Sequence, residues 1–235
     1  MQNNRKPIIS VIIPARNEEK ALPKVLSSIP PEQIDRVIVV DNGSTDATSA
    51  VAQKHGAETV YVETPGYGRA CLAGMAQAEG SDIIVFMDGD ASDYPEDIRS
   101  LIDPIINDET DFVIGSRLTG EAEAGSLTLP QRFGNSLACF LMKLFWGATY
   151  TDLGPFRAIR SMSLSALNMQ APTFGWTVEM QVRALKQGLR YMEVPVRYRK
   201  RIGVSKISGT LKGVILAGYY IIGTIFFEKF IRRKS

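Results

Sequence analysis

The chain has 235 residues, of which 45% are hydrophobic, and its formal net charge at pH 7 is +2. A chain of this size forms one substantial core, in a single large domain or in one domain with an appendage. Its two cysteines, Cys71 and Cys139, lie far apart in apolar segments. This spacing excludes a cysteine-based metal site and favours buried free thiols in a reducing compartment.

The charge is distributed unevenly along the chain. Residues 195–235 contain ten Lys or Arg and one acid, a balance of +9, so residues 1–194 have a balance of −7. A basic end on an acidic body suggests an anionic partner: a membrane surface, a phosphate or a nucleic acid. No signal peptide is expected, because the first apolar run begins at Ile8 and is broken by Pro14. We therefore expect a cytoplasmic protein.

Short apolar runs recur through the first half of the chain. Their continuous apolar character predicts strands that are covered on both faces, as in a parallel sheet. Helix-like stretches lie between them, and this alternation predicts an α/β fold. The predicted strands are 8–13, 36–40, 59–62, 82–86 and 111–115, and the predicted helices are 18–28, 45–55, 69–79 and 95–107.

The alternation stops after residue 115. Residues 118–130 have the small, polar composition of a surface loop. A helix is expected over 131–146, another over 176–187, and a further strand within 190–198. We interpret this second half as insertions built onto the sheet of the first half.

The last segment, residues 211–230, is apolar around nearly its whole circumference. Its uncharged core, 213–227, contains 15 residues. As a helix this core spans roughly 22 Å, against about 30 Å for the hydrocarbon core of a bilayer, so it is short for a transmembrane helix. Basic residues flank it, which favours a membrane-embedded or interfacial helix. An oligomer contact and packing on its own domain are the alternatives. We divide the chain into a domain, 1–210, and this helix with its tail, 211–235.

A glycine-rich stretch, PGYGRACLAG, follows the third predicted strand. A GxGxxG dinucleotide motif would need glycine where this chain has Cys71, and no GxxxxGK[ST] sequence is present. Both observations weigh against a Rossmann oxidoreductase and a P-loop NTPase. Phosphate binding at the start of the next helix stays open, with Arg69 as a nearby cation.

Polar residues follow the first two predicted strands, in VIIPARNEE and VIVVDNGSTDAT. Ligands of open α/β sheets bind outside the carboxyl ends of the strands. Asp41 can accept hydrogen bonds from a base or a ribose, while Ser44 and Asp46 would shape the turn and cap the helix. A well-capped turn that binds no ligand is the alternative.

The run VFMDGDASDYP, residues 85–95, carries the strongest functional signal. Asp88 and Asp90 follow a buried strand, and Asp93 comes three positions later. Carboxylates suit Mg²⁺ or Mn²⁺, and a metal with only two or three protein ligands keeps positions that a diphosphate can fill. An ordinary turn is the alternative, since Asp and Gly are common in turns. Three polar strand ends at one edge of one sheet favour the metal site.

The chain resembles the family 2 glycosyltransferases of the GT-A fold, and most of all their dolichyl- or polyprenyl-phosphate sugar transferase branch. The resemblance covers residues 8 to about 210 and rests on five motifs in order: VIIPARNEE, VVDNGSTDAT, MDGDASDYPED, FVIGSR and EVPVRYRKRIGVSKISG. It implies a mainly parallel central sheet with helices on both faces. It also implies an inverting transfer of a sugar from a UDP- or GDP-sugar, with a divalent metal.

The resemblance assigns roles on the donor side. Asp88 and Asp90 become the aspartates of the family's DxD motif, which act in catalysis and metal binding. Some family members follow this motif with a Gln that helps to hold the metal. Here Ser92 stands in that place, so Asp93 or a water would substitute. The residues assigned to the nucleoside pocket are Pro14, Glu18, Asp41 and Asp46.

The resemblance also places Arg117 and Arg132 near an acceptor phosphate, and Arg201 with Lys206 near the donor diphosphate. Guanidinium groups bind phosphate oxygens bidentately. A lipid phosphate needs no strong base, because its oxyanion is already a nucleophile. A hydroxyl acceptor needs a carboxylate to remove its proton. The candidates for that base are Asp152 and Glu179.

We therefore predict a metal-dependent glycosyltransferase that acts on polyprenyl phosphate, peripheral at the inner face of the membrane. One alternative is a soluble enzyme with a hydroxyl acceptor, in which residues 211–231 form a homo-oligomer contact. Another is a non-catalytic nucleotide-sugar-binding scaffold at the membrane. Nucleic-acid binding is disfavoured, because the basic residues flank an apolar helix instead of alternating with exposed aromatic residues.

Overall fold

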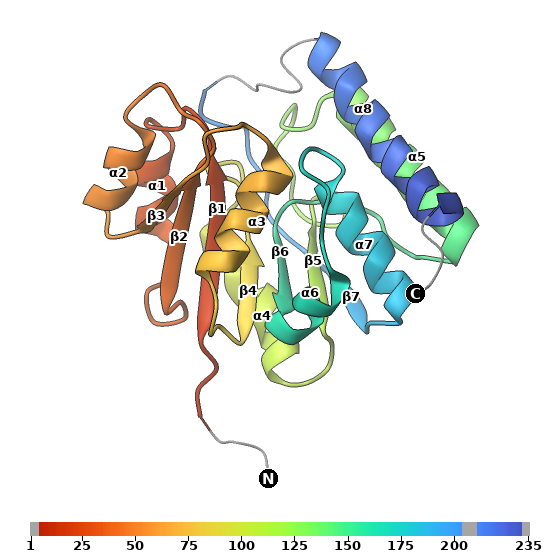
Figure 1. The fold of residues 1–235 in the computed structure, drawn as a ribbon, viewed down its shortest axis with the longest axis horizontal. Coiled ribbons are helices and arrows are strands. Elements are labelled where there is room, and N and C mark those ends of the chain that lie inside the picture. The colour runs from red at the N-terminus through yellow and green to blue at the C-terminus, as the bar shows by residue number, and fades with distance from the viewer. Residues whose placement is uncertain (1–4, 204–210, 232–235) are drawn as a thin grey trace.

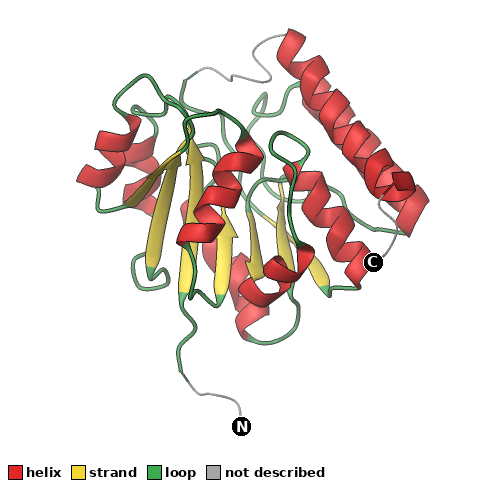
Figure 2. Ribbon diagram, viewed as in Figure 1, coloured by secondary structure: helices red, strands yellow, loops and turns green. Residues whose placement is uncertain are grey.

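The computed structural model describes residues 5–203 and 211–231. Its centre is one seven-stranded sheet with helices on both faces (Figure 1, Figure 2). The strands are β1 (Ile9–Ala15), β2 (Arg36–Asp41), β3 (Glu58–Tyr61), β4 (Ile83–Phe86), β5 (Phe112–Ser116), β6 (Arg157–Arg160) and β7 (Tyr191–Pro195). The helices are α1 (Leu22–Ser28), α2 (Thr48–Lys54), α3 (Tyr67–Gln77), α4 (Ile98–Ile106), α5 (Leu129–Trp146), α6 (Ser161–Leu167), α7 (Trp176–Gln187) and α8 (Leu211–Phe226), with a 3-10 turn η1 (Pro95–Asp97) and a π-helical turn η2 (Phe227–Ile231).

The strand order is β3-β2-β1-β4-β6-β5-β7. Neighbouring strands are parallel except at β6, which runs against both β4 and β5. The winding reverses at β1, since β2 and β3 lie on one side of it and β4 lies on the other. In an open α/β sheet such a reversal leaves room for a ligand outside the strand carboxyl ends. The mainly parallel α/β sheet expected from the sequence is confirmed.

The core forms one layer on each face of the sheet. Along β1, Val11 and Ile13 point into the layer that contains α1, α2 and α4. Ile12 points into the layer that contains α3 and α5 to α8. Because β1 is buried on both faces, its apolar run is continuous and does not alternate with polar residues.

Two elements, β6 and α6, were not expected from the sequence. The four residues of β6, RAIR, place an arginine at each end of the strand. So short a segment with two charges lacks the apolar pattern that identifies a buried strand. Arg157 is nevertheless fully buried, and its contacts are part of the site described below.

α5 and α8 lie side by side on the outside of one layer (Figure 1). α5 begins at a capping box of Thr128 and Gln131. α8 packs on α5 and α7, and η2 is anchored by Glu228, whose buried carboxylate pairs with Arg183 and Lys186. None of the helices within the described ranges is long and apolar enough to cross a membrane. The division of the chain at residue 210 falls where the structure is not described and stays a prediction.

Candidate active site

Two adjoining cavities lie at the carboxyl ends of β1 and β4. The strand-end cavity, about 340 Å³, lies against residues that follow β1 and β2. The helix-side cavity, about 270 Å³, extends from the sheet to α5 and α8. Five residues line both cavities: Tyr67, Asp88, Asp90, Phe174 and Arg201. The DxD aspartates therefore stand at the junction of two spaces.

Local backbone contacts fix the direction of each aspartate. One carboxylate oxygen of Asp90 accepts hydrogen bonds from the amide and hydroxyl of Ser92, with the amide at 2.9 Å. The other oxygen lies 3.2 Å from the Arg201 guanidinium. Asp88 accepts a hydrogen bond of 3.3 Å from the Tyr67 hydroxyl. Ser92 thus orients Asp90.

The electrostatics of this pair fit a divalent cation. Burial and the nearby charge of Asp90 raise the pKa of Asp88 to about 7. Two adjacent carboxylates disfavour each other's ionisation unless a cation stands between them. Asp88 and Asp90 are hard oxygen donors beside open space, so they suit Mg²⁺ or Mn²⁺.

Asp93 lies deeper than the DxD pair. It is fully buried, lines neither cavity, and accepts a hydrogen bond of 3.1 Å from the Asp88 amide. Burial, together with the charges of Asp88 and Asp90, raises its pKa well above the ordinary value. Among the described residues, no three His, Cys, Asp or Glu side chains are grouped to hold a metal. A bound ion would therefore depend on Asp88, Asp90 and ligand oxygens, and Asp93 supports the loop.

The segment after β7 holds the aspartate loop in place. The amide of Ile202 donates to the carbonyl of Asp90, and the amide of Arg199 donates to the carbonyl of Ser92, both at 2.9 Å. The Arg199 side chain also donates to the Ala91 carbonyl. Ala91 has a left-handed backbone, φ 63°, that few residues other than glycine adopt. These contacts stabilise the turn that directs Asp88 and Asp90 toward the cavities.

The predicted nucleoside-pocket residues divide into two groups. Pro14 and Glu18 line the strand-end cavity, as does Arg201. Asp41 instead holds its own turn, because its two oxygens accept hydrogen bonds from the Ser44 amide and the Ser49 hydroxyl.

Ser44 and Asp46 connect the loops after β1 and β2. The Ser44 hydroxyl accepts from the amide of Asn17 and the Asp46 carboxylate accepts from the amide of Glu19. Ser44 and Asp46 thus stabilise the loops beside the strand-end cavity, but neither residue lines it.

Two further cations expected to bind phosphate, Arg69 and Arg132, line neither cavity. Arg69 donates to the Pro65 carbonyl at 3.1 Å, beside the strand-end cavity. Arg132 is an exposed residue of α5. Lys206 lies outside the described residues. Their roles stay predictions.

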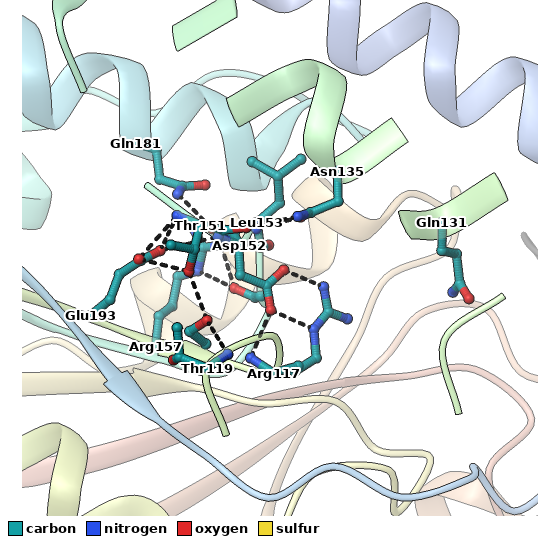
Figure 3. A network of polar contacts seen from close by, with 12 residues as sticks. Arg117, Thr119, Gln131, Asn135, Thr151, Asp152, Leu153, Arg157, Gln181 and Glu193 are labelled. Atoms are coloured by element: carbon teal, nitrogen blue, oxygen red, sulfur yellow. Dashed lines mark hydrogen bonds and ion pairs between the residues drawn. The ribbon is translucent and has the colours of Figure 1, made fainter. Parts of the chain in front are cut away.

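Arg117, at the end of β5, lines the helix-side cavity. Its guanidinium forms a bidentate pair with Asp152, at 2.8 and 2.7 Å (Figure 3). It also lies 5.1 Å from the ring centre of Tyr198. Burial alone would raise the pKa of Asp152, but the charge and hydrogen bonds of Arg117 lower it. Asp152 is 1% exposed and does not line the cavity. Its oxygens are occupied by Arg117, so its geometry is that of an anchor for the guanidinium.

A dense polar network holds the chain around Asp152 (Figure 3). Asn135 of α5 binds the carbonyl of Thr151 and the amide of Leu153, and Glu193 of β7 accepts from the amides of Thr151 and Asp152. The buried Arg157 donates to the carbonyls of Leu153, Gly154 and Thr177. Burial lowers the pKa of Arg157 to about 10. This network fixes the floor of the helix-side cavity.

Glu179, the other predicted base, lies outside both cavities. It is 3% exposed on α7, forms an ion pair with Arg183, and lines a separate cavity beside α8. Its carboxylate accepts hydrogen bonds from the amides of Gln170 and Ala171. The structure does not bring it together with Asp88 and Asp90.

Several lining residues were not predicted from the sequence. Tyr67 lies in the glycine-rich PGYG stretch, whose position at a helix start was the available signal. Asn42 follows Asp41 directly and lines the strand-end cavity. Phe174 and Tyr198 carry no sequence signal, because folding alone brings them to the cavities.

Residues 10–167 match the family described as Glycosyl transferase family 2. The chain belongs to this family. The UDP-N-acetylglucosamine–dolichyl-phosphate N-acetylglucosaminyltransferase of Methanococcus voltae is 31% identical to it, over 81% of this chain and 85% of that protein. The undecaprenyl-phosphate mannosyltransferase of Micrococcus luteus is 30% identical, over 87% and 89%. These relatives support the resemblance to the polyprenyl-phosphate branch.

A solved structure with the same fold is glucosyl-3-phosphoglycerate synthase from Mycobacterium tuberculosis, in complex with Mn²⁺, UDP-glucose and phosphoglyceric acid. Its TM-score is 0.75 and its identity is 25%, over 97% of this chain and 81% of that chain. The GT-A architecture expected from the motifs is therefore confirmed.

Proposed function

We propose that this glycosyltransferase moves a sugar from a UDP- or GDP-sugar to a polyprenyl phosphate, with inversion at the sugar. The observation that carries the proposal is the junction of the two cavities at Asp88 and Asp90. The strand-end cavity is the donor side, because it lies at the reversal of the sheet. The helix-side cavity is the acceptor side, with Arg117 at its floor and apolar residues of α8 in its wall.

Donor binding depends on residues already placed in the cavity. Asp88 and Asp90 would hold a Mg²⁺ or Mn²⁺ ion, which when bound stabilises the charge that develops on the departing diphosphate. Arg201 contacts Glu18 and Asp90, each at 3.2 Å, so its guanidinium is within reach of the same phosphates. The named relatives, which act on lipid phosphates, support this choice of substrates.

The acceptor requires no base in this scheme. A phosphate oxygen held by Arg117 attacks the anomeric carbon, the new C–O bond forms on one face, and the bond to the nucleoside diphosphate breaks on the other. The electron pair of the broken bond leaves with the nucleoside diphosphate. The acids that line the helix-side cavity within the described residues are Asp88 and Asp90 alone. Since both are assigned to the metal, the described residues provide no other carboxylate in this cavity to take the proton of a hydroxyl acceptor. A phosphate acceptor is therefore favoured.

The outer face of α5, α8 and η2 supports a peripheral membrane location. We define this outer face by its exposed apolar residues: Leu129, Phe133, Phe140, Leu144, Ile215, Tyr219, Phe226 and Phe230. α5 and α8 contain no acidic residue, and the one acid of η2, Glu228, is buried. Exposed Arg132 and Lys143 add positive charge. An apolar surface with only cations suits an anionic leaflet.

Incubation of the protein with Mn²⁺, a UDP- or GDP-sugar and undecaprenyl phosphate tests the function. We expect a glycolipid that disappears with EDTA and with Asp90→Asn, while Arg99→Ala, on the exposed side of α4, retains full activity. Absence of product across both classes of donor would overturn the proposal. Metal-dependent binding of the donor without transfer or hydrolysis would favour the non-catalytic scaffold.

A further inference from the structure

The loop between α6 and α7, residues 168–175, stands between the two cavities. Phe174 lines both of them, and Thr173 lines the strand-end cavity. The Phe174 ring also lies 6.3 Å from the ring of Tyr220 on α8, centre to centre. A change in the position of this loop therefore alters the donor side and the acceptor side together.

The loop is packed tightly on the donor side. The amide of Arg69, in the first turn of α3, donates to the Pro172 carbonyl at 3.1 Å. Gly68 faces the Ala171 carbonyl so closely that a methyl group on Gly68 would overlap it, and a methyl group on Gly66 would overlap the Pro172 carbonyl. These two glycines permit the loop backbone to rest on the start of α3.

The loop is packed equally tightly on the other side, where α8 lies. A methyl group on Gly175 would overlap the Thr224 hydroxyl. The loop thus fills the space between the start of α3 and α8. At its end the Trp176 amide donates to the Thr173 carbonyl and the Glu179 amide donates to the Gly175 carbonyl, where α7 begins. A loop in such a position needs an anchor from outside.

Glu179 supplies that anchor. One of its carboxylate oxygens accepts hydrogen bonds from the amides of Gln170 and Ala171, at 3.1 and 2.8 Å. The carboxylate is in turn paired with Arg183, which also binds Glu228 of η2 at 2.9 Å. One buried chain of charges therefore connects the loop, α7 and the end of α8.

We propose that Glu179 is a positioning residue that holds the α6–α7 loop, and through it Phe174, at the boundary between donor and acceptor. The inference rests on the proposed function for the identity of the two cavities. It departs from a role for Glu179 as a base, because the carboxylate acts on backbone amides and lies outside both cavities. Its consequence is that disturbance of the loop changes the affinity for both substrates.

The test compares Glu179→Ala, Glu179→Gln and Gly68→Ala. Glu179→Gln keeps an oxygen that accepts from the loop amides, whereas Glu179→Ala removes it. Gly68→Ala leaves Glu179 intact and displaces the loop from the other side, which keeps the test valid if Glu179→Ala fails to fold. Gly223→Ala on α8 is the matched control, because a methyl group there meets no atom within 4 Å.

Binding of UDP or GDP with Mn²⁺ is measured by calorimetry, and KM for farnesyl phosphate is measured by transfer. We expect Glu179→Ala and Gly68→Ala to weaken both by roughly tenfold, and Glu179→Gln and Gly223→Ala to stay within about threefold of wild type. If Glu179→Gln lowers kcat by roughly 100-fold at unchanged affinities, Glu179 transfers a proton and the proposal is wrong. Wild-type nucleotide affinity in Gly68→Ala also overturns it.

The calorimetric measurement of nucleotide binding does not require the protein to transfer a sugar. A wild-type protein that binds nucleotide but forms no glycolipid refutes the proposed function, and the comparison of variants still decides the role of Glu179.

Discussion

The Arg201 guanidinium lies 3.2 Å from a carboxylate oxygen of Asp90. A cation therefore already stands beside the aspartate that we assign to the metal. With a metal and a diphosphate bound as proposed, Asp90 would gain a stronger cationic partner and Arg201 would gain phosphate oxygens. The ion pair holds both side chains at the junction of the two cavities.

Arg201→Ala is expected to affect the nucleotide and the metal differently. Loss of a charge-assisted hydrogen bond should weaken binding of UDP or GDP roughly tenfold or more. Affinity for Mn²⁺ alone should stay equal or become tighter, because a competing cation is removed from Asp90. Calorimetry with each ligand separates the two effects. Arg99→Ala, whose side chain is 72% exposed, is the control. Equal loss of Mn²⁺ and nucleotide affinity would contradict the assignment.

Asp152→Asn tests whether Asp152 anchors Arg117. The exchange removes the charge from a buried pair and should lower the free energy of unfolding by about 3 kcal/mol. It should raise KM for the lipid phosphate with little change in donor affinity, since Arg117 lines only the helix-side cavity. Urea unfolding and steady-state kinetics give both values.

A double-mutant cycle of Asp152→Asn with Arg117→Lys should be strongly non-additive, because the two side chains share one interaction. A collapse of kcat at unchanged KM would instead identify Asp152 as a base.

Phe133→Glu with Phe140→Glu tests the outer face. We expect wild-type protein to float with vesicles that contain phosphatidylglycerol, and the double variant to remain at the bottom of the gradient with unchanged nucleotide binding. Met162→Glu is the matched control, because Met162 is an exposed apolar residue on α6, away from this face (Figure 1). If the double variant floats like wild type, the face does not bind lipid. Light scattering that shows a wild-type dimer lost in the double variant would assign the face to a second copy.

The Arg36–Glu58 pair gives a pH-dependent contribution to stability. The hydrogen bonds and charge of Arg36 lower the pKa of Glu58 to about 2, below its ordinary value of 4.5. The contribution is therefore complete above about pH 4.5 and is lost as the pH falls toward 2. Because the pair is partly exposed, we expect no more than about 1 kcal/mol.

Unfolding of wild type and Glu58→Gln, measured from pH 7 to pH 2, checks this. The difference between the two proteins should be largest at neutral pH and vanish near pH 2. Glu109→Gln, the same exchange at an exposed position, is the control. A difference that grows as the pH falls would refute the assignment.

The sequence identified the donor side of the site better than the acceptor side. Asp88 and Asp90 were found because they directly follow a buried apolar run, and a parallel sheet brings such strand ends to one edge. The pairing of Arg117 with Asp152 was not predicted, because it joins residues 35 positions apart in the chain on different elements. Asp152 therefore resembled a free carboxylate, and its partner became visible only in the fold.

The role of Phe174 and the strand β6 were also not predicted, because both depend on contacts between residues far apart in the chain. Nothing in the polar, proline-containing loop around Phe174 distinguishes a residue that lines two cavities from one on the surface. The strand β6 is short and carries Arg157, whose burial is made possible by three carbonyls that come together only after folding. Local patterns describe neighbours in the chain, whereas these features depend on neighbours in space.

The single reversed strand has a geometric consequence. β6 separates β4 from β5, so the loops that carry Asp90 and Arg117 start two strand spacings apart, about 10 Å. Because β6 points the opposite way, the segment that leads into it lies at this edge of the sheet, and its Leu153 and Pro155 line the helix-side cavity. The strand therefore separates the loop of Asp88 and Asp90 from the loop of Arg117 and places a third segment in the wall of the cavity between them. With β4 and β5 adjacent, the two loops would start only about 5 Å apart, and this third segment would have no place between them.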